Sequence, residues 1–378
     1  MLLMGILTGL VVLVVLIVVH ELGHAIVARR NGVIVEEFGI GFPPKAWGKK
    51  LKNGVLFTLN WLPLGGFVRL KGEHDSATGK GTYGAASFWV KTKILLAGVV
   101  MNWLVAAAIL TVLAVVGLPK VVPNQFVMNG DGRVETSAVS LVRIVEGSAA
   151  EKAGFKADDA IVSIDDTLIE SSTDFIAMTR QNAGETVKVT YERDDQTHTT
   201  PVALGEDVDK GVFGAVVGQS EKIYATWSAP IVGIVTTGQL SWETLQGLGG
   251  MIGKLATGVV QQFSGNEQTR AEAQAKLDEV SNSVAGPIGI LGVIFPSAQA
   301  QGFGQIVLLT AVISLTLAVM NILPIPALDG GRWWTMAIFR VFGKKLTKER
   351  EETIQGIGML VLFGLIILIT VSDVLKLW

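Results

Sequence analysis

The sequence predicts a polytopic α-helical membrane protein with four transmembrane helices, a membrane-associated β-hairpin and a small extracytoplasmic α+β domain. The chain has 378 residues, of which 49% are hydrophobic and only 17% are charged. Its mean hydropathy of +0.49 is too high for an ordinary soluble protein of this length. Long apolar runs alternate with polar segments, and the net charge of those segments changes sign along the chain.

Four apolar runs are long enough, or nearly so, to cross a bilayer: residues 1–19, 94–118, 306–323 and 357–371. A helix needs about 20 apolar residues to cover a hydrocarbon core of about 30 Å. The first run has neither a basic stretch before it nor a small-residue cleavage site after it. We therefore expect a retained transmembrane helix there and not a signal peptide.

The charges of the connecting segments predict the orientation of these helices. Residues 28–93 carry eleven Lys or Arg and four acidic residues, and residues 324–352 carry six basic residues. Residues 119–300 carry thirteen basic and twenty-three acidic residues. Because cytoplasmic loops are enriched in Lys and Arg, we expect both basic segments in the cytoplasm, and the acidic segment and both termini outside.

The acidic segment begins with a predicted domain at residues 119–218. Short β-prone runs alternate there with turn residues, and one helix is predicted between them. The runs cover residues 141–145, 160–164 and 186–191, the helix covers 172–181, and residues 211–218 are expected to add a closing strand. This pattern is typical of a small α+β domain.

Residues 219–303 are predicted to form amphipathic helices on the outer membrane face, followed by a linker. Polar side chains interrupt the apolar residues of 224–260 too often for a bilayer core. A fifth span is the alternative, although it would break the charge-based topology. Residues 263–283 are charged and helix-prone without evident chemistry, and residues 304–378 hold the last two spans.

The first 118 residues contain the first two spans and, between them, a predicted β-hairpin at 54–73. Its sequence, "GVLFTLNWLPLGGFVRLKGE", has two β-like runs on either side of a Pro-Leu-Gly-Gly turn. Both faces are apolar, so we expect this hairpin to dip into the bilayer. A plain cytoplasmic hairpin is the alternative.

Composition excludes several kinds of site. The chain has no cysteine, so it has no disulfide bond, and a metal must be held by His, Asp or Glu. Only four histidines are available for that purpose. The net charge is −2 and the basic residues form no stripe, so we expect no nucleic-acid partner.

The first apolar run ends in "HELGH", which has the spacing of a zinc site. His20 and His24 are four residues apart, so on a helix they project from one face and can hold one ion. Glu21 lies beside them, where a glutamate serves as general base for the water that Zn²⁺ activates. An acidic residue at membrane depth costs about 2.5 to 3.5 kcal/mol, which favours this reading over a polar patch without function.

A catalytic zinc site usually has three protein ligands, and Asp329 is the predicted third. It follows the third apolar run in "NILPIPALDGG", where Pro324 and Pro326 interrupt the helix at membrane depth. The alternative is a simple helix-ending turn. His74 and His198 lie in the predicted cytoplasmic and outer segments, so the topology argues against them as ligands.

These two motifs resemble the site-2 protease family of intramembrane zinc metalloproteases. The second is Asn-x-x-Pro-x-Pro-x-Leu-Asp-Gly, at residues 321–330. The layout of spans and outer domain is similar to the bacterial RseP (regulator of sigma-E protease) type. The resemblance implies one Zn²⁺ held by His20, His24 and Asp329, with Glu21 as general base and Asn321 near the substrate backbone.

Two further stretches carry the resemblance. "LLAGVVMNWLV" is similar to the family's A-G-P-x-x-N motif, with Val99 in place of proline. Asn102 is then either a substrate contact or an interhelical hydrogen-bonding residue. "EGSAAEKAGFKADDAIVSID" resembles a bacterial PDZ domain, with Ala149 where proline is usual and Asp158 where glycine is typical.

The resemblance implies cleavage of single-span membrane proteins in the bacterial inner membrane, after a first cut by another protease. Anti-sigma factors and remnant signal peptides are the substrates typical of the family. The PDZ domain would bind new C termini, filter substrates by size, or act as a spacer. The alternatives are a membrane-anchored zincin that cuts soluble loops, with a downstream glutamate as third ligand, and a non-catalytic PDZ scaffold. On the predicted topology the active site faces the cytoplasmic side.

Overall fold

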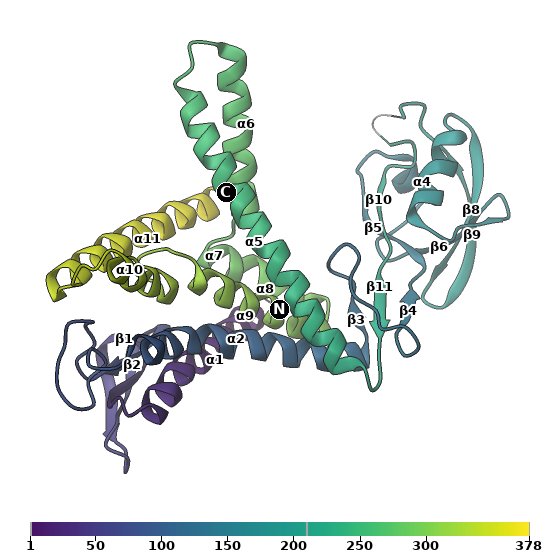
Figure 1. The fold of residues 1–378 in the computed structure, drawn as a ribbon. Coiled ribbons are helices and arrows are strands. Elements are labelled where there is room, and N and C mark those ends of the chain that lie inside the picture. The colour runs from purple at the N-terminus through teal and green to yellow at the C-terminus, as the bar shows by residue number, and fades with distance from the viewer. Residues whose placement is uncertain (1, 209–210, 378) are drawn as a thin grey trace. The chain divides into compact units, whose positions relative to one another are not determined.

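Four helices among residues 2–208 and 211–377, which the computed structural model describes, are long and apolar enough to cross a membrane. They are α1 (Leu2–Arg30), α2 (Phe88–Val116), α9 (Phe303–Ile322) and α11 (Lys348–Leu377). Each covers most or all of one predicted apolar run, so the prediction of four membrane-length helices is confirmed (Figure 1).

The chain divides into two units. One comprises Met1–Leu113 together with Pro230–Trp378 and contains the membrane-length helices. The other is Ala114–Ala229 and contains most of the β-strands. The second unit extends beyond the predicted domain at 119–218 because β3 (Leu118–Pro119) pairs with β11 (Glu221–Tyr224).

The predicted hairpin at 54–73 is wrong in its pairing. The strands are β1 (Val35–Lys50) and β2 (Leu56–Leu70), joined by a short turn. Both halves of β2 pair with the first half of β1: Phe38 is paired with Phe57 on one side and Val68 on the other. The two β-like runs therefore do not pair with each other, because the segment before the hairpin inserts between them.

Helix α5 (Ala229–Gln262) is one continuous helix of 34 residues and is the first of the helices within residues 219–303. Its first half packs against the spans: Leu240 contacts the core formed by Ala106 and Leu315, and the Trp103 indole donates a hydrogen bond to Ser241. The helix then continues antiparallel to α6 (Glu267–Ser283), as Figure 1 shows. Lys254 pairs with Glu279 across this helical hairpin.

A broken helical segment leads into α9. It consists of α7 (Pro287–Gly289), η1 (Ile290–Ile294) and α8 (Phe295–Ala300), and it bends by 47° from α6. Asp373 on α11 accepts hydrogen bonds from the N–H groups of Gly286 and Gly289, which caps α7. Gly9 lets α1 approach closely, since a Cβ there would lie 2.6 Å from the Phe295 ring.

The second unit has the predicted α+β organisation. Its larger sheet has the path β10-β5-β6-β8-β9, with β7 (Thr167–Leu168) paired to β6. The strands on this path are β5 (Val139–Ile144), β6 (Ala160–Ile164), β8 (Thr186–Arg193), β9 (Gln196–Ala203) and β10 (Ala215–Gly218). Helix α4 (Ser172–Gln181) has the predicted bounds, and a short α3 (Ala149–Lys152) precedes β6.

The core of this unit is built from the inward faces of the strands and from α4. The ring of Phe213 packs there between two others: its centroid lies 5.2 Å from that of Phe155 and 5.0 Å from that of Phe175. A second, small sheet has the order β3-β11-β4, with β4 at Arg133–Thr136. The chain enters this unit after α2 through β3 and leaves it before α5 through β11. The small sheet therefore pairs the entering segment with the leaving segment.

Candidate active site

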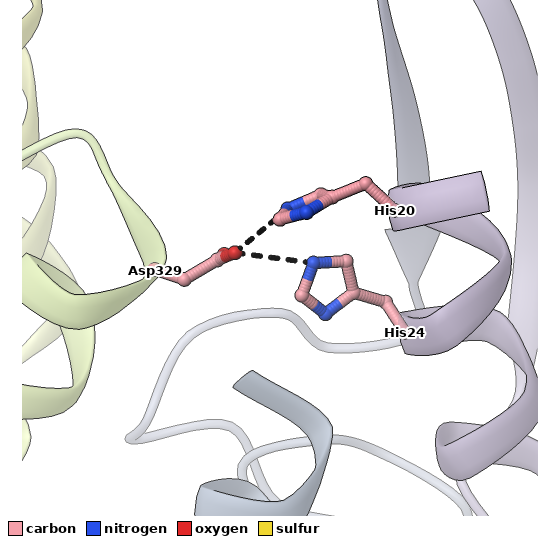
Figure 2. A group of neighbouring side chains, drawn as sticks. All are labelled: His20, His24 and Asp329. Carbon is pink, nitrogen blue, oxygen red and sulfur yellow. Dashed lines mark hydrogen bonds and ion pairs between the residues drawn. The ribbon is translucent and has the colours of Figure 1, made fainter. Parts of the chain in front are cut away.

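Two turns of one helix and the start of another form a cluster of metal-ligating groups. Asp329 Oδ2 lies 3.0 Å from His20 Nε2 and 3.2 Å from His24 Nε2 (Figure 2). The three ligand atoms lie within 4.8 Å of one another, although the residues are some 300 positions apart in the chain. Ligand atoms around one tetrahedral zinc ion are about 3.3 Å apart, so this donor set fits zinc.

The far nitrogens of both histidines are also held. His24 Nδ1 lies 2.7 Å from the carbonyl oxygen of Ile94 on α2, to which it donates as N–H. His20 Nδ1 lies 3.4 Å from the side-chain amide of Asn102, also on α2. A metal-bound imidazole usually donates its other N–H to such a partner, which fixes the ring and leaves Nε2 free for the ion.

The side-chain oxygen of Asn102 bears on which nitrogen of His20 carries the proton. Its side chain is fully buried, and Oδ1 is a buried oxygen without a hydrogen-bond partner among the described residues. Exchanging the amide oxygen and nitrogen lets Oδ1 accept from His20 Nδ1–H, which gives both of these atoms a partner and places the amide NH2 at the other buried position. Asn102 therefore makes an interhelical contact with His20, and its role as a substrate contact stays a prediction.

Gly98 leaves the space that an ion between the histidines requires. A Cβ at this position would lie 2.5 Å from His24 Nε2 and 2.6 Å from His20 Nε2. Gly98 and Asn102 are four residues apart on α2, so they share the face that meets α1. Sequence reasoning missed this role of Gly98, although the Ala-Gly pair before Asn102 is the small-residue signal for close helix approach.

Asp329 is positioned by the irregular backbone before α10 (Asp329–Val341). Helix α9 ends at Ile322, and the chain turns through Ala327 at φ +77° before α10 begins. The turn packs directly on the new helix, since a Cβ at Gly331 would collide with the Ile325 carbonyl. Gln355 on α11 also accepts a hydrogen bond from Ala327 N–H at 2.6 Å. The Asp-Gly-Gly sequence is thus required by close backbone packing next to the ligand.

Glu21 lies beside the cluster at the wall of a cavity. The cavity has a volume of about 480 Å³ and is lined by Glu21, His24, Asp329 and residues of β2, α10 and α11. Residues 66–70 of β2 approach it closely: a Cβ on Gly66 would lie 3.4 Å from Glu21 Cγ. These residues pair with β1 on one side only, so the second edge of this strand segment is unpaired among the described strands.

An ion-pair network lines another part of this cavity. Arg332, one turn after Asp329, pairs with Glu73 at 3.1 Å and with Glu351 on α11 at 3.0 Å. Its guanidinium also lies over the ring of buried Tyr83, 5.0 Å from the centroid. Burial raises the pKa of the Tyr83 phenol, so this group stays neutral. The network ties the end of β2 to α10 and α11, and sequence reasoning did not identify it.

The remaining predicted residues lie outside the cluster. Asn321 is partly exposed, and its amide donates to the Leu317 carbonyl at 2.9 Å, so its substrate role stays a prediction. His74 lines the cavity but pairs with Glu352 at 3.5 Å. His198 stacks on Tyr191 in the second unit.

Comparison with known proteins agrees with this geometry. The model of peptidase family M50, the family of the site-2 proteases, matches residues 8–365. The chain belongs to this family. A Clostridium perfringens protein that bears a zinc metalloprotease name is 31% identical over 95% of each chain. The regulator of sigma-W protease RasP of Bacillus subtilis is 27% identical over 96% of each chain, and the zinc metalloprotease RasP of Bacillus licheniformis is 25% identical over 96% and 97%.

Membership in peptidase family M50 settles the class of activity. The chain is a zinc-dependent metalloprotease of the site-2 protease family, and its general function is regulated intramembrane proteolysis of membrane proteins. It is a polytopic inner-membrane protein. The alternative of a non-catalytic scaffold is wrong. Among solved structures, the PDZ domain of an SdrC-like protein from Listeria monocytogenes is 25% identical, covering 21% of this chain and 86% of that chain with a TM-score of 0.20.

Proposed function

We propose that this M50 metalloprotease hydrolyses peptide bonds in single-span membrane segments, with zinc held by His20, His24 and Asp329. Glu21 is the general base of this proposal. The observation that carries it is the cavity of about 480 Å³. Its wall combines His24 and Asp329 of the metal cluster with Glu21 and the apolar residues Phe67 and Val68, so one space offers both the chemistry and an apolar binding surface.

Each group at the site has a separate role in the proposed hydrolysis. Zinc, when bound, polarises the scissile carbonyl and lowers the pKa of a water ligand toward about 7. Glu21 takes a proton from the attacking water and returns it to the leaving amine. His24 keeps its proton on Nδ1, where Ile94 O accepts it, so Nε2 remains a neutral donor to the ion.

An unpaired strand edge supports binding of an extended substrate. A transmembrane helix cannot be cut until its scissile amide is exposed, and a strand edge can pair with the unwound segment through main-chain hydrogen bonds. Residues 66–70 of β2 offer such an edge beside Glu21. Asn321, near the end of α9, is proposed to contact the backbone of the same substrate.

The PDZ domain is proposed to bind the new C termini of substrates that another protease has shortened. Strand β10 lies at one end of the sheet path, so among the described strands it has an unpaired edge for a peptide strand. Ile176 on α4 and Val216 on β10 are large apolar side chains that stay 40% and 41% exposed. The other possibility is a size filter that excludes uncut substrates without binding them.

The charge pattern supports an active site in the cytoplasmic half of the bilayer. Arg29 and Arg30 end α1 close to the HELGH motif, and cytoplasmic ends of spans are enriched in such residues. The PDZ domain and both termini would then lie outside the cytoplasm. Because one relative is named a regulator of sigma-W protease, anti-sigma factors are proposed substrates, with remnant signal peptides as a second class.

The test uses purified full-length protein in nanodiscs with a single-span reporter and, separately, the reporter's soluble loop as a peptide. We expect cleavage within the membrane segment, loss of cleavage with a chelator, and loss of zinc in Asp329→Ala. Glu352→Ala, which removes an exposed acid from the cavity wall, is the control and should retain zinc. Zinc retention by Asp329→Ala, or cleavage of the soluble loop alone, would favour an anchored zincin with another third ligand.

A further inference from the structure

A second cavity lies beside the C-terminal end of α10, whereas the candidate active site lies at the N-terminal end of this helix. It has a volume of about 480 Å³ and lies between the start of α2, the end of α10 and the loop that follows α10. Four cationic side chains line it, namely Lys91, Arg340, Lys344 and Lys345, against the single carboxylate of Asp75. It shares no lining residue with the active-site cavity.

The charges in this cavity are unbalanced. The carboxylate of Asp75 is already engaged by buried Lys91, at 2.5 Å. Among the described residues, no carboxylate lies within 4.0 Å of the charged groups of Arg340, Lys344 or Lys345. These three cations are exposed on the cavity rim, so the cavity presents net positive charge to a ligand.

The N-terminus of α2 adds a second attraction for anions. The helix begins at Phe88, and Ser87 and Phe88 both line the cavity. A long helix carries a partial positive charge at this end, and its first N–H groups have no partner within the helix. No acidic side chain occupies the first turn of α2. Phosphate groups bind at such helix ends when cationic side chains lie nearby.

The surroundings of the cavity are those of a membrane interface. Its floor is apolar, formed by Met336 and Leu346, which pack together with Leu95. Beside it, Val341 and Phe342 are 82% and 71% exposed, and Trp89 is 70% exposed. Aromatic and apolar side chains with such exposure are typical of helix ends at the level of lipid headgroups. A soluble anion would not require this apolar rim.

We propose that this cavity binds the phosphate of an anionic phospholipid headgroup. The phosphodiester lies against the N-terminus of α2 and is held by Arg340, Lys344 and Lys345, while the acyl chains follow the exposed apolar residues. Basic pockets between membrane helices recognise such headgroups through this combination of charge and depth. Arg340 lies near the end of α10, and α10 begins with Asp329. A lipid bound at the end of α10 would therefore anchor the helix that carries the proposed zinc ligand.

The test measures lipid retention by full-length protein extracted from nanodiscs of phosphatidylcholine with a minority of phosphatidylglycerol. Native mass spectrometry counts the retained molecules, and a photoreactive phosphatidylglycerol identifies the contacted peptides. We compare wild type with Lys344→Gln/Lys345→Gln. The matched control is Lys49→Gln/Lys50→Gln, which removes the same charge from exposed positions on β1. Inorganic phosphate in the buffer is the competitor that distinguishes a soluble anion from a lipid.

We expect preferential retention of phosphatidylglycerol and cross-links within residues 86–91 and 336–346. The cavity variant should retain it roughly 25-fold less well, since each basic side chain near an anionic surface contributes about a fivefold preference. The control should retain it as wild type does, and inorganic phosphate should not displace it. Equal losses in both variants, cross-links elsewhere, or displacement by inorganic phosphate would overturn the proposal.

Discussion

Asn102 on α2 contacts His20 on α1 in the buried interior, with 3.4 Å between the side-chain amide nitrogen and His20 Nδ1. The side chain of Asn102 is fully buried, and it is not among the residues that line the cavity beside Glu21. Its position is that of a partner that holds a metal-binding imidazole in one orientation. The first prediction follows from this contact.

Asn102→Ala should weaken zinc binding about 10- to 100-fold, because losing the partner of a metal-bound histidine frees the ring to rotate. Zinc affinity is measured by competition with a chromophoric chelator in detergent. The control is Ser314→Ala, since the Ser314 hydroxyl donates to the backbone oxygen of Asn102 without touching His20. Unchanged zinc affinity in Asn102→Ala would refute the orienting role.

Gly98→Ala should abolish zinc binding while leaving the helices intact. The added methyl group would occupy the space between His20 Nε2 and His24 Nε2, at 2.6 and 2.5 Å from them. Zinc per purified chain is counted by elemental analysis, and helix content by circular dichroism. Gly364→Ala is the matched control, since a Cβ at this position on α11 meets nothing within 4 Å. Full zinc occupancy in Gly98→Ala would show that the ion lies elsewhere.

Arg332→Gln should loosen the end of the active-site cavity without removing zinc. It leaves Glu73 and Glu351 without their shared cation, and breaking one side of a buried pair costs about 3 to 5 kcal/mol. Hydrogen exchange should then rise in residues 71–76 and 348–355. Arg350→Gln, an exposed arginine one residue before Glu351, should change neither segment. Unaltered exchange in Arg332→Gln would mean that the network does not hold these elements together.

A buried ion pair makes the stability of the second unit, Ala114–Ala229, depend on pH. Asp159 is 1% exposed and accepts two hydrogen bonds of 2.6 Å from Arg193. Burial alone would raise the pKa of Asp159, but hydrogen bonds from Arg193 and from Lys156 N–H hold it below its ordinary value. A depressed pKa stabilises the fold above the unfolded pKa of about 3.9, and this contribution is lost as the pH falls through the folded pKa.

Asp159→Asn should therefore destabilise the domain by about 1.5 to 3 kcal/mol at neutral pH, and the difference from wild type should shrink below about pH 4. Urea unfolding of the full chain is followed by pulsed hydrogen exchange in residues 139–203, with pulses at one fixed pH. Asp174→Asn, on the exposed side of α4, is the control. A difference that stays constant down to acidic pH would contradict the role of the Asp159 charge.

The metal cluster could be predicted because its signals are local. His20 and His24 need only helical spacing, and the two prolines before Asp329 mark an interrupted helix at membrane depth. The residues that complete the site depend on long-range packing. Nothing local shows that Gly98 faces the histidines, or that Arg332 reaches Glu73, because these contacts arise when separate helices pack.

The hairpin prediction failed for a related reason. The runs around the Pro-Leu-Gly-Gly turn are β-prone, and a local turn favours pairing of its two neighbours. In the structure the first half of β1 lies between them, and Phe38 pairs with both runs. Pairing between strands is decided by the whole sheet, so local patterns predict that strands exist but not which of them are neighbours.

Glu21 is the residue on which the proposed hydrolysis depends most directly, and one variant tests its role. Purified Glu21→Gln in nanodiscs keeps the shape of the side chain but removes the proton acceptor beside the cluster. We predict that it binds zinc as wild type does and fails to cleave the single-span reporter, with a loss of at least about 100-fold. Cleavage at the wild-type rate by zinc-loaded Glu21→Gln would contradict the proposed mechanism.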